Sequence, residues 1–129
     1  MKIFKSLAVF CCAVICALTF TSCGETTVVT EMYNVGIHGY DNGSVQDLTA
    51  AQTYLNSKGC KNGDNWTFTD SNTANCDKKA EAKFNELVKN LSREEVAALV
   101  SDKFTFTYSC TRSVGAESVT IAAWEYPGK

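Results

Sequence analysis

The stretch Phe104–Tyr126, FTFTYSCTRSVGAESVTIAAWEY, decides the fold of this chain. Its first part alternates aromatic side chains with Thr and Ser, which is the pattern of a strand with one buried face. A segment that contains a glycine, residues 113–117, separates it from a second β-prone run. This arrangement predicts a β-hairpin with strands at Phe104–Arg112 and Ser118–Tyr126.

The alternation assigns each hairpin side chain to one of two faces. We expect the first face to pack against helices, with Phe104, Phe106, Tyr108, Cys110, Val119, Ile121 and Ala123. We expect the second face to carry a row of hydroxyls and two large rings, with Thr105, Thr107, Ser109, Thr111, Thr120, Trp124 and Tyr126. Rings with a polar tip make Trp124 and Tyr126 candidate contacts for a glycan or a peptide. The alternative is an ordinary solvated face of an antiparallel sheet.

Upstream of the hairpin, residues 27–38 are rich in Val, Thr, Tyr and Ile and predict a strand. Ser44 and Asp47 form a capping-box pattern, so we expect a helix to begin there and to end at Gly59. A polar loop follows. Within this loop, residues 66–68 are a possible short strand. The side chain of Trp66 is expected either to contact a ligand or to fill part of the core.

Two more helices are expected between this loop and the hairpin. Asp77 opens the clearest apolar stripe, formed by Ala80, Phe84, Leu87, Val88 and Leu91. Ser92 and Glu95 form another capping pattern, which predicts a helix–helix corner at residues 91–93. The sequence therefore predicts an α+β fold: an antiparallel sheet of three to four strands with about three helices packed on one face.

The N-terminal residues carry the marks of a secretory signal. Lys2 and Lys5 precede an apolar run, residues 7–20, which is too short to span a membrane. Thr21 and Ser22 follow, and then Cys23. These residues resemble the signal segment of a bacterial lipoprotein precursor, although the aromatic Phe20 departs from the branched aliphatic residue of that pattern.

The resemblance covers residues 1–23 and implies cleavage before Cys23, which then carries the lipid. Two or three acyl chains make such an anchor stable. By the same resemblance Gly24, in place of an aspartate, favours the outer membrane over the inner membrane. We expect residues 1–22 to be a signal peptide and residues 23–129 to form a single small domain anchored through Cys23.

Cleavage changes the charge and the cysteine count. The 107 residues that remain carry ten basic and fourteen acidic side chains, a formal net charge of −4. An acidic chain without a basic cluster argues against nucleic acid as a partner. Three cysteines remain, and in an oxidising compartment we expect a Cys60–Cys76 disulfide with Cys110 free and buried. A bridge from Cys110 to one of the other two is the competing interpretation.

Few residues suggest catalysis or metal binding. His38 is the only histidine, and the spacing of the three cysteines matches no zinc motif. The Asp- and Asn-rich segments also lack the spacing of a calcium loop. We expect no metal and no cofactor. The sharpest enzyme hypothesis pairs Cys110 with His38, with Asp41 or another acid orienting the imidazole.

The sequence thus favours a lipid-anchored envelope protein that binds a macromolecule or a glycan without catalysing a reaction. Two alternatives remain at this point. One is an inhibitor or a toxin-immunity type of lipoprotein, and the other is a small thiol-dependent enzyme that uses Cys110.

Overall fold

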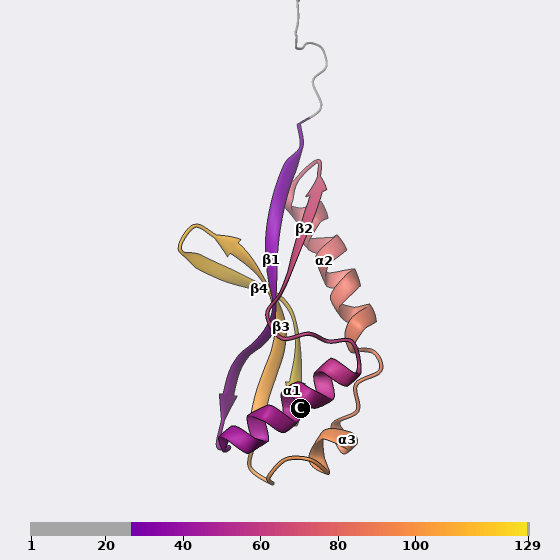
Figure 1. Ribbon diagram of the computed structural model, residues 1–129. Helices are drawn as coiled ribbons and strands as arrows, with labels where there is room; N and C mark the ends of the chain where they lie inside the picture. Colours follow the sequence, from indigo (N-terminus) through magenta and orange to yellow (C-terminus); the bar gives the residue numbers. More distant parts are fainter. Residues whose placement is uncertain (1–26, 129) are drawn as a thin grey trace, which may run out of the picture.

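A computed structural model describes residues 27–128, which form a four-stranded antiparallel sheet and three helices (Figure 1). The elements are β1 (Val29–Asp41), α1 (Val45–Ser57), β2 (Asp64–Asp70), α2 (Thr73–Val88), α3 (Arg93–Ala97), β3 (Thr105–Val114) and β4 (Glu117–Tyr126). The strand order is β2-β1-β3-β4. The predicted α+β class is confirmed. The expected signal peptide and the expected lipid site, Cys23, lie outside the described residues.

One face of the sheet and the three helices share a single core. Paired residues of neighbouring strands lie on the same face, and their buried pairs are Tyr33 with Trp66, Val35 with Cys110, Phe106 with Tyr126, and Tyr108 with Trp124. The helices cover these side chains with Ala51, Tyr54, Leu55, Cys76, Ala80, Phe84 and Val96. No helix within residues 27–128 is long and apolar enough to cross a membrane.

The predicted caps define two of the helices. Ser44 Oγ accepts a hydrogen bond from Asp47 N at 3.2 Å, and the Asp47 carboxylate accepts one from Ser44 N at 3.0 Å. Gly59, with φ +84°, adopts the left-handed conformation that ends α1. Ser92 caps α3 in the predicted place by accepting from the backbone N–H of Glu95.

Helix α2 begins four residues before its predicted start at Asp77. The reason is Asn72, whose side chain accepts a hydrogen bond from Asn75 N at 2.8 Å and caps the helix. Asp77 therefore lies inside α2, where its carboxylate accepts hydrogen bonds from Tyr33 Oη and Arg112 Nε at 2.7 and 2.8 Å. These bonds join the first turns of α2 to β1 and β3.

The hairpin forms as predicted, but the side-chain orientations in β4 are partly wrong. The register is interrupted between Cys110 and Thr111, where β4 carries one extra residue, Ile121. Such a bulge changes which side chains face the core on its two sides. Trp124 and Tyr126 consequently point into the core, 7% and 8% exposed, and not outward as expected.

Candidate functional site

The face of the sheet opposite the helices, which we call the polar face, carries the predicted row of hydroxyls. Thr105, Thr107, Ser109 and Thr111 alternate with Phe106, Tyr108 and Cys110, whose side chains belong to the core. Ser109 and Thr111 are themselves 2% and 9% exposed, so Thr105 and Thr107 are the more accessible hydroxyls of the row. By register their neighbours on the same face are Asp41, Gly39, Gly36 and Asn34 on β1, and Glu125, Ala123 and Thr120 on β4. The hydroxyl row lies on this face as predicted, whereas the rings of Trp124 and Tyr126 belong to the core. Of these two residues, Tyr126 also lines the hollow described next.

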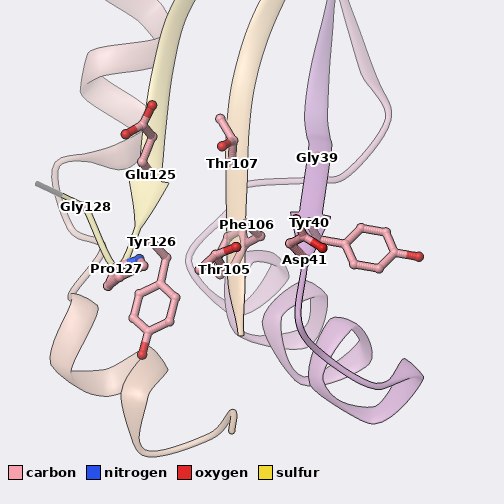
Figure 2. Close-up of a pocket in the computed structure, with 10 residues that line it drawn as sticks. All are labelled: Gly39, Tyr40, Asp41, Thr105, Phe106, Thr107, Glu125, Tyr126, Pro127 and Gly128. Atoms are coloured by element: carbon pink, nitrogen blue, oxygen red, sulfur yellow. The ribbon is translucent and has the colours of Figure 1, made fainter. Parts of the chain in front are cut away.

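A hollow of about 450 Å³ lies at the end of the polar face where β1 and β4 terminate (Figure 2). It is lined by Gly39, Tyr40, Asp41, Thr105, Phe106, Thr107, Glu125, Tyr126, Pro127 and Gly128. Its volume is within the range of small-molecule sites. Gly39 borders open space, since a Cβ added at this position would meet no heavy atom within 4 Å.

The polar side chains of the hollow come from three neighbouring strands. Thr105 and Thr107 of β3 lie in the middle, Asp41 of β1 pairs with Thr105, and Glu125 of β4 pairs with Thr107. The ring of Tyr40, which is also among the lining residues, projects away from these strands (Figure 2). The polar side chains in the lining are therefore two threonines and two acidic residues.

Next to the hollow, His38 joins a chain of hydrogen bonds that crosses the polar face. Its Nδ1 lies 2.7 Å from Ser109 Oγ, and its Nε2 lies 2.8 Å from Asn34 Oδ1. Asn34 Nδ2 in turn donates to Asn65 Oδ1 at 3.0 Å. Since the amide nitrogen of Asn34 is the donor toward Asn65, its oxygen faces His38 and accepts from Nε2–H. Nδ1 is then the acceptor for the Ser109 hydroxyl.

The sequence identified His38 as a candidate functional residue but did not reveal its hydrogen-bond partners, Asn34 and Ser109. Asn34 holds the imidazole in the place where Asp41 or another acid was expected. Plain alternation along β1 places His38 on the same face as Asn34, opposite Tyr33, Val35 and Ile37, so the face of His38 could be predicted. The pairing that puts Ser109 opposite Gly36 could not, because register depends on the whole sheet. The irregularity between Ile37 and Gly39 then brings Gly39 onto this face as the partner of Thr107.

Partial burial of the ring lowers the pKa of His38 from its ordinary value of 6.5. The folded protein therefore favours neutral His38, whereas the unfolded chain takes up a proton at higher pH. We expect the free energy of unfolding to fall as the pH drops from 7.5 through 6.5 to 5.5. Urea unfolding at these three pH values measures this fall. His38→Gln should remove it, because glutamine does not titrate.

The pH range in which His38 changes the free energy of unfolding is separate from the range in which the carboxylates do so. Hydrogen bonds lower the pKa values of Asp47 and Glu95 from ordinary values of 3.8 and 4.5, so their contributions are lost only at more acidic pH. If His38→Gln and the unchanged protein showed the same slope between pH 7.5 and 5.5, the assignment to His38 would be wrong.

The proposed Cys110–His38 pair is not formed. Cys110 points into the core, with Val35 and Ala122 as its neighbours on β1 and β4, while His38 lies on the polar face. Burial raises the pKa of Cys110 to about 11, so the thiolate that catalysis requires is disfavoured. The geometry therefore gives no support to a thiol-dependent enzyme.

The expected Cys60–Cys76 disulfide is also absent, and Cys60, Cys76 and Cys110 are free and buried. Cys60 Sγ lies 3.4 Å from the carbonyl oxygen of Leu87, near the C-terminal end of α2. Cys76 lies in the first turns of the same helix, roughly 16 Å away at 1.5 Å per residue. A disulfide needs Cα atoms within about 7 Å, so these two cysteines cannot bond in this fold. Cys110 is buried, as expected.

Trp66, the third aromatic candidate, belongs to the core. It is 5% exposed, its Nε1 donates to Asp64 Oδ2 at 3.1 Å, and Lys83 Nζ lies 4.4 Å from its ring centroid. Across residues 27–128, no three His, Cys, Asp or Glu side chains come together in a group that could hold a metal ion.

Comparisons of the chain with protein-family models, with curated proteins and with solved structures give no match. The chemistry of the polar face is therefore the basis for a functional assignment.

Proposed function

We propose that this protein is a lipid-anchored protein of the bacterial cell envelope that binds a glycan in the hollow of the polar face. The anchor is supported by the basic residues, the short apolar run and Cys23 at the N-terminus. Gly24 after the cysteine supports an address in the outer membrane. The binding role does not require catalysis.

The observation that carries the binding role is the group of hydroxyl and carboxylate side chains in the lining of the hollow. Thr105 and Thr107 can each donate and accept a hydrogen bond, and the exposed carboxylate of Asp41 accepts strong bonds from ligand hydroxyls. A saccharide presents many hydroxyls in a small volume, so it can satisfy these groups together. An apolar ligand would leave them without partners, which is costly once water is excluded.

Gly39→Leu tests this role, because Gly39 lines the hollow and a Cβ added there meets no heavy atom within 4 Å, so a leucine side chain can occupy the space meant for the ligand. The full chain, solubilised in detergent, is first screened against an array of immobilised oligosaccharides, and the best ligand is titrated by calorimetry. We expect Gly39→Leu to weaken binding at least about tenfold, a change of about 1.4 kcal/mol.

The matched control for this test is Thr67→Leu. Thr67 is exposed on β2 and faces the same side of the sheet, away from the hollow, so this variant should bind as well as the unchanged protein. The proposal is wrong if no oligosaccharide binds, or if Gly39→Leu and Thr67→Leu bind equally well.

Membrane attachment is tested in cells fed an alkyne analogue of palmitate. The protein should incorporate the label and sediment with the outer membrane. Cys23→Ser should abolish both properties, and retention of the label in that variant would rule out Cys23 as the lipid site.

A further inference from the structure

One aromatic side chain beside the hollow does not belong to the core. Of the Phe, Tyr and Trp side chains that the structure describes, Tyr40 is the only exposed one, at 56%. It lies between Gly39 and Asp41, and all three residues line the hollow. The structure thus buries Trp124 and Tyr126, the rings expected to contact a ligand, and exposes Tyr40 instead.

The core supports this exposed ring from one side. The ring centroids of Tyr40 and Phe104 lie 6.4 Å apart, and their planes are inclined at 49°. Phe104 is 1% exposed, and a Cβ added at Gly43 would collide with its ring, so the chain packs closely around Phe104. A ring that already rests on a fixed neighbour loses less freedom when a ligand covers its open side, and binding then costs less.

The sheet leaves the Tyr40 ring open at the edge of β1. β2 pairs with β1 only over Val29–Val35, so no strand among the described residues lies beyond the last part of β1. The ring projects toward this side, away from the threonines of β3 (Figure 2). It therefore lies farther from those threonines than one strand spacing, about 4.8 Å. A single sugar that binds Thr105 and Thr107 leaves the ring uncovered, whereas a chain that continues across β1 reaches it.

Gly39 lies on the path that such a chain would take. It has no side chain, and a Cβ added there would meet no heavy atom within 4 Å. It is also the residue of β1 that pairs with Thr107, so it lies between the hydroxyl row and the open edge. The hollow and the exposed ring are therefore connected by an unobstructed stretch of β1.

The ring favours a particular class of sugar. In glucose and in N-acetylglucosamine the polar substituents are equatorial, so both faces of the sugar ring carry only C–H groups. Such a face covers an aromatic ring and buries apolar area, while the hydroxyls at the rim remain free for hydrogen bonds. A β1,4 linkage keeps successive sugars of this kind in an extended line.

From this arrangement we propose that the site binds a β1,4-linked glycan of several sugars with equatorial substituents, one sugar in the hollow and a later one stacked on Tyr40. This inference rests on the proposed glycan-binding function and specifies its ligand class. Tyr40 then determines the preference for chain length, because only a chain that crosses Gly39 covers its ring.

The test compares glucose and N-acetylglucosamine with their β1,4-linked tetramers on the detergent-solubilised full chain. Calorimetry measures the tetramers, and NMR titration measures the weaker monomers. We expect at least one tetramer to bind at least about tenfold more tightly than its monomer. Tyr40→Ala should remove most of this gain and leave the affinity for the monomer unchanged, which a general disturbance of the fold would not do. Tyr40→Phe keeps the ring and should retain the gain.

The matched control is Met32→Ala. Met32 lies on the same strand, is 61% exposed and is far from the hollow, so this variant should bind the tetramer as well as the unchanged protein does. Equal affinity for monomer and tetramer would overturn the inference and leave the proposed glycan binding intact. So would a Tyr40→Ala variant that keeps the gain or loses affinity equally for both, or an array that yields a glycan when neither tetramer binds. If neither tetramer nor any glycan of the array bound, both proposals would be overturned.

Discussion

Trp124→Ala is expected to lower the free energy of unfolding by about 3–5 kcal/mol, as for other large aromatic side chains removed from a core. The ring is 7% exposed, its centroid lies 5.9 Å from that of Phe106, and the Arg93 guanidinium covers it. In a domain of about 100 residues this loss corresponds to a fall in Tm of at least about 10 °C. Urea and thermal unfolding of the purified protein measure it.

Two variants calibrate this result. Trp124→Phe keeps an aromatic ring against Phe106 and should cost clearly less than the alanine variant. Tyr40→Ala removes an aromatic side chain that is 56% exposed, so it should change stability by less than about 1 kcal/mol. If Trp124→Ala unfolded like Tyr40→Ala, Trp124 would lie on the surface, as the strand alternation alone had indicated.

The second large effect concerns the three thiols of the folded domain. Cys60, Cys76 and Cys110 are each 0% exposed, so alkylation requires the domain to open. With a stability of at least about 5 kcal/mol, labelling in the native state should be at least about a thousandfold slower than in urea. Mass spectrometry of the labelled peptides follows each cysteine separately, and reductant is left out.

An exposed thiol provides the reference rate for this experiment. Ser118→Cys lies near the tip of the β3–β4 hairpin and should react in the native state as a free thiol does. In urea all three native cysteines should become labelled. Labelling of Cys110 alone would reveal a Cys60–Cys76 bridge, and rapid labelling of Cys110 in the folded protein would contradict its burial.

Local chemistry accounts for the parts of the fold that were predicted correctly. Ser44, Gly59 and Ser92 act through hydrogen bonds or a backbone conformation within a few residues, so the sequence nearby contains the whole signal. The same is true of the hydroxyl row in β3, where aromatic and polar side chains alternate without interruption. Asn72 could also have been predicted, because it belongs to the residue types that begin helices.

The errors arise where pairing between distant segments decides the structure. Ile121, Ala122 and Ala123 offer similar apolar surface on both faces of β4, so the pattern does not locate the bulge that turns Trp124 inward. Register is specified by the whole sheet and by the core beneath it. The separation of Cys60 from Cys76 likewise depends on α2. This helix begins at Thr73, so Cys76 lies in its first turns while Cys60 contacts its C-terminal end.

Strand β1 also sets the distance between the proposed lipid anchor and the hollow. It spans Val29–Asp41, roughly 40 Å at 3.3 Å per residue, and its last residues, Gly39, Tyr40 and Asp41, line the hollow. A protein tethered through Cys23, six residues before Val29, would hold its ligand at the far tip of this strand. Such a molecule would sample a layer several nanometres from its own bilayer, and it would engage polymers suspended there in preference to the headgroups beneath it.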